Sequence, residues 1–379
     1  MPTEAILRDS KHPLMTARVY NFSAGPAILP EPVLHQVQQD MLALPGVGSS
    51  ILEISHRSAT FLEILERTRS DLKQLLAVPD NYQILFLQGG SRLQFSMVPM
   101  NLLRGRKHGA HYVVTGSWGE KAALEARREG TVHLAWDGKR TNYQRTPTGE
   151  EIQGIPDTSY VHFTSNETIQ GVQFATAPQV GELPLVCDAS SDFLSRPLPV
   201  SDYGLIYACA QKNVGPAGLT VVVIREDLLE RSSDNLPGYL NYRSHAEHQS
   251  LYNTPPTFGI YVTGLIARWL LDDMGGLAQM DHCNRDKAQL LYEVLDQCQG
   301  FYRGHAQRGS RSLMNVTFNL PSNQLQEQFL SMAQQRKLCH LKGHRSVGGI
   351  RASIYNAMPR EGIAALRDLM LEFYDQHST

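Results

Sequence analysis

The sequence predicts an α/β protein whose large domain holds a mostly parallel sheet and whose smaller C-terminal domain is α+β. Two observations carry this prediction. Between about residues 60 and 225, short apolar segments alternate with segments of helical spacing, as in parallel sheets with right-handed crossovers. From about Pro256 the helical spacing dominates, which indicates that a second domain follows.

The first long helix is predicted behind Thr60. Thr60-x-x-Glu63 matches a capping box, in which the two side chains satisfy free backbone N–H groups. Apolar residues then recur on one helix face at Phe61, Ile64, Leu65, Leu72, Leu75 and Leu76.

Six strands are predicted after this helix. They lie at Gln83–Leu87, Tyr112–Thr115, Tyr160–Phe163, Leu185–Cys187, Leu205–Ala208 and Leu219–Ile224. Several lack the polar alternation of a half-exposed strand, which indicates that both faces of the sheet are covered. Such sheets bind ligands at the carboxyl ends of their strands, so functional residues are expected there.

The C-terminal part is predicted to mix helices and strands. Helices are expected at Ile260–Asp272, Asp286–Gln297, Gln324–Gln335 and from Arg360, and strands at Asn315–Leu320 and Gly349–Ser353. Gly275-Gly276 marks the expected boundary between a large domain at 17–275 and a small domain at 276–379. The N-terminal segment of the large domain is expected to pack near the small one. Residues 1–16 are mostly polar and unpatterned, which is typical of a disordered leader.

Composition excludes several classes of protein. A net charge of −2 argues against a nucleic-acid or membrane-surface binder. No apolar run reaches the roughly 18 residues of a membrane span, and the first 16 residues lack the sustained apolar segment of a secretory signal. The two Asn-x-Thr matches, Asn166-Glu167-Thr168 and Asn315-Val316-Thr317, are therefore taken as chance. Five scattered cysteines without Cys-x-x-Cys spacing indicate neither a metal knuckle nor a redox motif, and are typical of reduced thiols in a cytoplasmic protein.

A carboxylate and a lysine follow two of the predicted strands. Asp188 ends the strand at Leu185–Cys187, and Lys212 follows the next one in Ala210-Gln211-Lys212-Asn213. This pair suits pyridoxal phosphate, because a lysine amine can bind the cofactor as an imine and an aspartate can keep the pyridine nitrogen protonated. Taken alone, such a pair is more often a surface lysine and a helix-capping aspartate.

A glycine-rich turn, a tryptophan and basic clusters add to this pattern. Gln88-Gly89-Gly90-Ser91-Arg92 follows a strand and precedes a helix, a position where backbone N–H groups bind phosphate. Trp118 follows another strand and could stack on a planar cofactor, although tryptophans more often belong to a core. Cations gather at three places: His56-Arg57, Arg92, and Lys342–Arg345 with Arg351. They favour an anion site, against the ordinary alternative of solvated surface charge.

Five longer strings share their wording with one family. They are Asn21-Phe22-Ser23-Ala24-Gly25-Pro26-Ala27, Glu53-Ile54-Ser55-His56-Arg57, Gln211-Lys212-Asn213-Val214-Gly215-Pro216-Ala217-Gly218, Tyr252-Asn253-Thr254-Pro255-Pro256 and Lys342 to Ser353. From about Tyr20 to Phe373 the chain resembles the phosphoserine aminotransferases, which are class V, fold-type I pyridoxal-phosphate enzymes. Cys209 and Ser91 depart from residues common in that family, which has glycine or alanine there, and Ala24 replaces a serine found in some members.

The resemblance implies a role for each matching residue. Lys212 would form the Schiff base and move the proton, Asp188 would pair with the pyridinium, Trp118 would stack on the ring, and Thr168 would bind its phenolate oxygen. Ser91, Arg92 and Gln211 would hold the cofactor phosphate, together with Asn253 and Thr254 of a neighbouring subunit in a homodimer. Substrate carboxylate and phosphate would be held by His56, Arg57, Arg92, His344, Arg345 and Arg351. No metal is implied.

The implied reaction is the transfer of an amino group from glutamate to 3-phosphooxypyruvate in serine biosynthesis. The family also implies activity on the related phosphorylated hydroxy keto acid of vitamin B6 synthesis. Two alternatives stay open: another class V enzyme, such as an alanine–glyoxylate aminotransferase or a cysteine desulfurase, and a non-catalytic descendant that serves as a scaffold. A desulfurase needs a reactive cysteine on a mobile loop, whereas Cys187 and Cys209 fall in or beside predicted buried strands.

Overall fold

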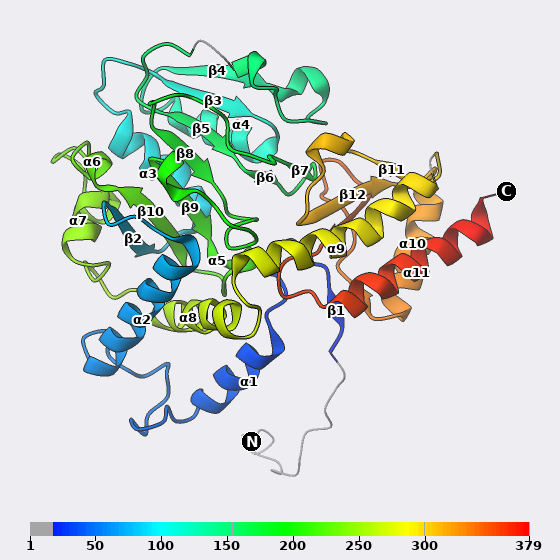
Figure 1. Ribbon diagram of the computed structural model, residues 1–379, viewed down its shortest axis with the longest axis horizontal. Helices are drawn as coiled ribbons and strands as arrows, with labels where there is room; N and C mark the ends of the chain where they lie inside the picture. The colour runs from blue at the N-terminus through cyan, green and yellow to red at the C-terminus, as the bar shows by residue number, and fades with distance from the viewer. Residues whose placement is uncertain (1–17, 153–154, 299, 379) are drawn as a thin grey trace, which may run out of the picture.

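A central sheet organises the structure, a computed structural model that describes residues 18–152, 155–298 and 300–378 (Figure 1). Within these residues the sheet has seven strands in the order β2-β10-β9-β8-β5-β3-β4. Their bounds are β2 Tyr82–Leu87, β3 Ala110–Val114, β4 Val132–Asp137, β5 Val161–Thr164, β8 Leu185–Asp188, β9 Leu205–Cys209 and β10 Thr220–Arg225. β10 runs antiparallel to both neighbours, and the β9-β8-β5-β3-β4 pairs are parallel, so the prediction of a mostly parallel sheet is confirmed.

The sequence analysis placed six of these strands to within about two residues and missed β4. The placed strands are apolar and almost wholly buried, whereas β4 reads Val-His-Leu-Ala-Trp-Asp and stays partly exposed at the edge of the sheet. An edge strand lacks the continuous apolar run that marks a covered strand, which explains the omission.

Helices cover both faces of this sheet. Alternate side chains of one strand face opposite layers: Ile84 and Phe86 join the core under α2 (Ala59–Leu76) and α8 (Thr257–Asp272), while Leu85 and Leu87 join the core under α3 (Gly90–Leu102) and α4 (Ser117–Ala126). Shorter helices flank these layers at α1 Glu31–Asp40, α5 Ala210–Asn213, α6 Glu226–Leu229 and α7 Tyr242–Glu247.

The N-terminus of α2 corrects one expectation. The capping box predicted at Thr60 and Glu63 is wrong, because the Ser58 hydroxyl caps the helix by accepting from Phe61 N at 3.2 Å. The helix therefore begins at Ala59. A serine two residues upstream can satisfy the same N–H groups, and the pattern Thr-x-x-Glu does not distinguish the two choices.

The C-terminal part forms a second core. It contains α9 Leu277–Gln297, β11 Arg303–Gly304, β12 Asn315–Asn319, α10 Asn323–Gln335, β14 Ile350–Ser353 and α11 Arg360–His377. β11, β12 and β14 form an antiparallel sheet, and β1 (Tyr20–Asn21) pairs with β13 (Leu338–Cys339). Through β1 the N-terminal segment adds Phe22 and Ile28 to this core. α9 begins nine residues before the start predicted at Asp286.

The division into domains at residue 275 stays a prediction. α8 ends at Asp272, and α9 follows a turn at Gly275 and Gly276, both of which have positive φ. α9 runs from the first core, to which it gives Met280, into the second, to which it gives Leu291 (Figure 1). The leader predicted at 1–16 lies outside the described residues. In the part of the chain that is described, no helix combines the length and apolarity that crossing a membrane requires.

Candidate active site

A cavity of about 330 Å³ opens at the carboxyl ends of the parallel strands. Nine of the residues predicted from the sequence line it: Ser91, Arg92, Trp118, Thr168, Asp188, Gln211, Lys212, His344 and Arg351. They come from the ends of β2, β3, β8 and β9, from the hairpin that follows β5, and from β14 with the loop before it. The site is therefore built where a parallel sheet brings the ends of its strands together.

Lys212 sits on α5, a four-residue helix directly after β9. The helix is held from both sides: Gln211 O accepts from Ala27 N at 2.9 Å, and Asn213 Oδ1 accepts from Asn356 N at 3.0 Å. Burial lowers the pKa of Lys212, but the nearby Cys209, Tyr355 and Asp188 groups outweigh it and raise the pKa above its usual value.

Asp188 ends β8 and is 4% exposed. Its Oδ1 accepts from Ser190 N at 3.0 Å and from the Ser190 hydroxyl, which also contacts the Ser91 hydroxyl. Burial raises the pKa of Asp188, and the Lys212 ammonium partly offsets this rise. Ser190, which the sequence analysis missed, therefore links the carboxylate to the glycine-rich turn.

The glycine-rich turn joins β2 to α3. Gly89 and Gly90 have φ of 91° and 65°, values that only glycine adopts readily. They lead into α3, whose first turn carries Ser91 and Arg92. The amide groups of a helix N-terminus attract anions, so this wall of the cavity suits a phosphate.

Trp118 forms another wall. Its ring centroid lies 5.4 Å from Lys212 Nζ, and its indole N–H donates to Thr168 Oγ1 at 3.0 Å. Glu167, another residue that the sequence analysis missed, is 0% exposed and accepts from Trp118 N at 3.0 Å and Gly119 N at 2.7 Å. Burial raises the pKa of Glu167 to about 7, although both backbone donors lower it.

Cations surround the mouth of the cavity. The pKa of Lys121 is lowered by burial, by the Arg92 charge and more weakly by the Arg345 charge. The pKa of His344 is lowered by burial and by the charges of Arg351, Lys121 and Arg345. Burial also lowers the pKa of Arg351. Mutual repulsion among cations makes this region favourable for a multiply charged anion. Lys121 was missed because it lies in a helix whose spacing looks ordinary.

Five predicted site residues do not line this cavity: His56, Arg57, Asn253, Thr254 and Arg345. Arg57 and Thr254 are exposed, and the Thr254 carbonyl accepts from Gln88 Nε2 at 3.0 Å. Thr254 therefore lies beside the glycine-rich turn of its own chain. Arg345 is exposed in the loop before β14. A single chain does not test the expectation that Asn253 and Thr254 serve a neighbouring subunit.

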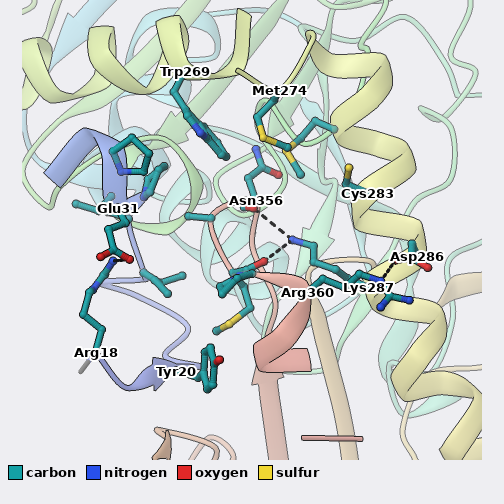
Figure 2. Close-up of a pocket in the computed structure, with 18 of the residues that line it drawn as sticks. Arg18, Tyr20, Glu31, Trp269, Met274, Cys283, Asp286, Lys287, Asn356 and Arg360 are labelled. Carbon is teal, nitrogen blue, oxygen red and sulfur yellow. Dashed lines mark hydrogen bonds and ion pairs between the residues drawn. The ribbon is translucent and has the colours of Figure 1, made fainter. Parts of the chain in front are cut away.

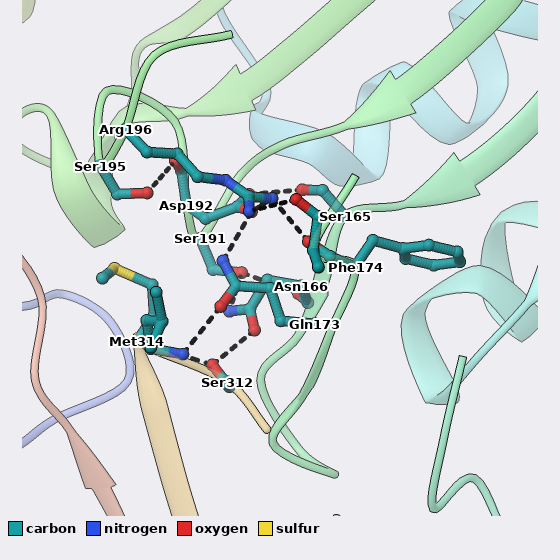
Figure 3. A network of polar contacts seen from close by, with 12 residues as sticks. Ser165, Asn166, Gln173, Phe174, Ser191, Asp192, Ser195, Arg196, Ser312 and Met314 are labelled. Carbon is teal, nitrogen blue, oxygen red and sulfur yellow. Dashed lines mark hydrogen bonds and ion pairs between the residues drawn. The ribbon is translucent and has the colours of Figure 1, made fainter. Parts of the chain in front are cut away.

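A buried polar network ties the β8 end to the C-terminal sheet (Figure 3). Asn166 Nδ2 donates to Ser191 Oγ at 2.9 Å and to Asn315 Oδ1 at 2.8 Å, and Ser312 Oγ donates to Asn166 Oδ1 at 2.6 Å. Asn315 Nδ2 in turn donates to Tyr355 Oη. Both asparagines of the two Asn-x-Thr matches are thus buried in this network, which favours the expectation that the matches are chance.

A larger cavity of about 810 Å³ is lined by the N-terminal segment, α8, α9 and the loop before α11 (Figure 2). Its lining holds no predicted site residue. Lys287 is 4% exposed there and donates to the carbonyls of Ile354, Tyr355, Asn356 and Met358 at 2.8–3.3 Å. These four hydrogen bonds of Lys287 fix the segment around Asn356. Because Asn356 N donates to Asn213 on α5, they also support the helix that carries Lys212.

Comparisons with known proteins agree with this geometry. A family model described as aminotransferase class-V matches residues 19–366. The phosphoserine aminotransferase of Rhodopirellula baltica is 54% identical over 379 residues, with 100% of both chains covered. This alignment also includes the leader, so the match extends beyond the resemblance seen from Tyr20 to Phe373.

Two solved structures are similar over nearly the whole chain. Phosphoserine aminotransferase from Bacillus circulans subsp. alkalophilus shares 46% identity at a TM-score of 0.92, covering 95% of this chain and 99% of its own. The pyridoxal-phosphate-bound phosphoserine aminotransferase from Trichomonas vaginalis shares 40% identity at a TM-score of 0.88, covering 93% and 100%.

Proposed function

Because the chain belongs to the class-V aminotransferase family, as a relative of the phosphoserine aminotransferases over its full length, we propose that it transfers the amino group of glutamate to 3-phosphooxypyruvate. The products are O-phosphoserine and 2-oxoglutarate, and the chain is a pyridoxal-phosphate-dependent transaminase of serine biosynthesis. The observation that carries the choice of substrate is the group of cations around a cavity that also holds Lys212 and Asp188.

The residues of the cavity fit the cofactor. When bound, pyridoxal phosphate supplies a ring that withdraws electrons from the substrate α-carbon. Lys212 would hold the cofactor covalently and move the proton at that carbon, and Asp188, buried near Lys212, would keep the pyridine nitrogen protonated. Trp118 would stack on the ring, with the Thr168 hydroxyl near its phenolate oxygen.

The cofactor phosphate would lie against the glycine-rich turn. Ser91 and Gln211 line this end of the cavity, and the first turn of α3 presents its N-terminal amides there. Arg92, exposed in the same turn, would serve either this phosphate or a substrate anion.

Both substrates carry two anionic groups, so one pocket must accept each in turn. Arg351 would grip the α-carboxylate common to both, because its guanidinium is partly buried beside Thr168. His344, Arg345 and Arg92 would receive the phosphate of one substrate and the side-chain carboxylate of the other. Guanidinium groups bind both anions in bidentate geometry.

We also propose a homodimer with active sites at the subunit interface, in which Asn253, Thr254, His56 and Arg57 complete the partner's site. In the segment 42–62, which carries His56 and Arg57, the large apolar side chains Leu42, Val47, Leu52 and Leu62 are exposed. Apolar exposure of this kind is typical of an interface. A cytoplasmic location is supported by the cysteines, since all five lie among the described residues as free thiols.

Two measurements test the proposed function. The purified protein should show an absorption band near ~410–430 nm, and Lys212→Ala should remove the band and at least about 10²–10⁴-fold of the turnover while the fold is kept. In a coupled assay with glutamate, 3-phosphooxypyruvate should exceed pyruvate and glyoxylate in kcat/KM by orders of magnitude. Equal efficiency with glyoxylate would favour an alanine–glyoxylate type of enzyme, and absence of the band would favour a scaffold.

A further inference from the structure

The N-terminus of α4 has no cap of its own. Gly116 occupies the N-cap position and offers no side-chain acceptor, although the first N–H groups of a helix need one. A Cβ at Gly116 would lie 2.5 Å from Glu167 Cδ. A capping side chain at position 116 would therefore clash with Glu167, which caps the helix instead.

The cap comes from the hairpin of β6 (Asn166–Glu167) and β7 (Val172–Gln173). Glu167 Oε2 accepts from Trp118 N at 3.0 Å, and Glu167 Oε1 accepts from Gly119 N at 2.7 Å. Gln170 Oε1 accepts from Ser117 N at 3.4 Å. The two amides that Glu167 binds need two acceptor oxygens, and among side chains of this length only a carboxylate offers both.

The same hairpin also holds the tryptophan ring. Thr168, the residue after Glu167, accepts from the Trp118 indole N–H at 3.0 Å. Trp118 is thus fixed at its backbone and at its ring by two successive residues. Its ring faces the Lys212 amine and the Arg92 guanidinium, at 5.4 and 5.9 Å from the ring centroid.

The hairpin is itself anchored to the C-terminal sheet. Gln170 O accepts from Thr317 Oγ1 at 2.9 Å, and Gly171 O accepts from Ser312 N at 3.0 Å. A Cβ at Gly171 would lie 2.7 Å from Asn315 O, and its φ is 69°. Only glycine permits this close approach. The contact with β12 therefore fixes the position of the hairpin, and with it the position of Glu167 relative to α4.

Burial of the acid is costly, which argues against a passive role. Glu167 is 0% exposed, and a buried carboxyl is stabilised only by the hydrogen bonds and charges around it. The groups that act on it are the two amides, the Lys212 and Lys121 ammonium groups and the Asp188 carboxylate. A glutamine would fill the same space without this cost, but it would leave one amide facing an NH₂ group.

We propose that Glu167 is a positioning residue, which fixes Trp118 against the cofactor ring by holding the first turn of α4. This inference rests on the proposed function only in so far as the ring that Trp118 faces is that of pyridoxal phosphate. Glu167 itself touches neither cofactor nor substrate in this assignment.

The test compares Glu167→Gln with Glu120→Gln. Glu120 is an exposed acid in the first turn of the same helix, so its variant controls for the loss of negative charge near the helix N-terminus. In Glu167→Gln the Kd of pyridoxal phosphate should rise roughly 10- to 100-fold, as when a supporting hydrogen bond to a site residue is lost. Glu120→Gln should stay within about twofold. Near-wild-type cofactor affinity in Glu167→Gln overturns the proposal.

A cofactor-free readout separates this proposal from the proposed function. In protein without cofactor, hydrogen exchange at the Trp118 and Gly119 amides should quicken at least ~10-fold in Glu167→Gln and not in Glu120→Gln. If the exchange rates of these amides do not change, Glu167 does not hold the first turn of α4, whatever the enzyme's substrate. Loss of the cofactor band in the wild-type protein would reject the proposed function and leave the exchange result unaffected.

A double-mutant cycle shows whether Glu167 acts through Trp118. In a Trp118→Ala background the ring is absent, so Glu167→Gln should add less than about threefold to the cofactor Kd, because coupled residues are non-additive. Full additivity contradicts the proposal. If Glu167→Gln does not fold, the same cycle is run with Glu167→Asp, whose charge is kept but whose shorter side chain cannot reach both amides.

Discussion

Arg351 Nη1 donates to the backbone carbonyl of Thr168 at 3.3 Å. Arg351 belongs to β14 of the C-terminal sheet, and Thr168 follows β6 in the hairpin that holds Trp118. The group proposed to bind the substrate carboxylate is therefore tied to the wall proposed to bind the cofactor ring. The same hairpin would then orient both substrate and cofactor, which lowers the entropic cost of bringing them into the reactive geometry.

Arg351→Ala should damage both half-reactions. The α-carboxylate is common to both substrates, so kcat/KM for glutamate and for 3-phosphooxypyruvate should each fall ~10- to 150-fold, the loss of one charge-assisted contact of about 1.5–3 kcal/mol. Arg351→Lys should recover only part, because an ammonium cannot bind a carboxylate bidentately. The exposed Arg140 offers a control at Arg140→Ala. A loss confined to one substrate would show that Arg351 does not hold the shared carboxylate.

Asp188→Asn should weaken the electron withdrawal that the cofactor ring provides. An amide cannot hold the pyridine nitrogen protonated, so kcat should fall at least ~10²-fold, about 2.7 kcal/mol. The amide keeps the acceptor that Ser190 uses, and the cofactor should still bind. Single-turnover kinetics with glutamate measure the effect, and a kcat within about threefold of the parent would mean that another group supports the ring.

The pKa of Glu167 makes stability depend on pH in a defined direction. Its folded pKa of about 7 lies above the ordinary value of 4.5, so the folded chain binds the proton more tightly than the unfolded one. This contribution is complete below pH 4.5 and is lost as the pH rises through 7. Urea unfolding of cofactor-free protein should therefore show wild type losing up to about 3 kcal/mol relative to Glu167→Gln between pH 4.5 and 8. A pH-independent difference would contradict a buried titrating acid.

Residues beside covered strands were predictable, and those set by distant contacts were not. Asp188 and Lys212 follow apolar strands, and the carboxyl ends of parallel strands meet at one edge, so sequence order was enough to bring them together. Glu167 acts by meeting the amides of Trp118 and Gly119 from another strand, and no local pattern encodes that contact. In the sequence, Glu167 was noted only as the middle residue of the glycosylation match Asn166-Glu167-Thr168.

Assembly limits prediction in a second way. Asn253 and Thr254 were expected to serve a neighbouring subunit, and His56 and Arg57 lie away from the cavity of their own chain. In the proposed homodimer their roles would depend on the surface of a second copy, which neither periodicity nor strand order describes. The resemblance to a family supplied these assignments. Mixed dimers that carry Arg57→Ala in one subunit would show which subunit's active site Arg57 serves.

Lys121 should contribute to recognition of the substrate phosphate. Its ammonium lies 4.3 Å from the Trp118 ring centroid, and its pKa is lowered by burial, by Arg92 and more weakly by Arg345, which places it among the cations at the mouth. Lys121→Met keeps the length of the side chain and removes the charge. The KM for 3-phosphooxypyruvate should rise about 10-fold, while kcat/KM for pyruvate, which lacks the phosphate, should stay within about twofold.

His344 supplies an independent readout of the same change. The Lys121 charge helps to lower the pKa of His344, so Lys121→Met should raise that pKa, which proton NMR of the imidazole measures in the absence of substrate. Arg345→Ala should raise it as well and should also raise the KM for the phosphorylated acceptor, provided that glutamate does not depend equally on this arginine. A raised His344 pKa with an unchanged KM would mean that Lys121 belongs to the cation cluster but does not reach the phosphate. Phosphate recognition would then rest on the arginines and His344.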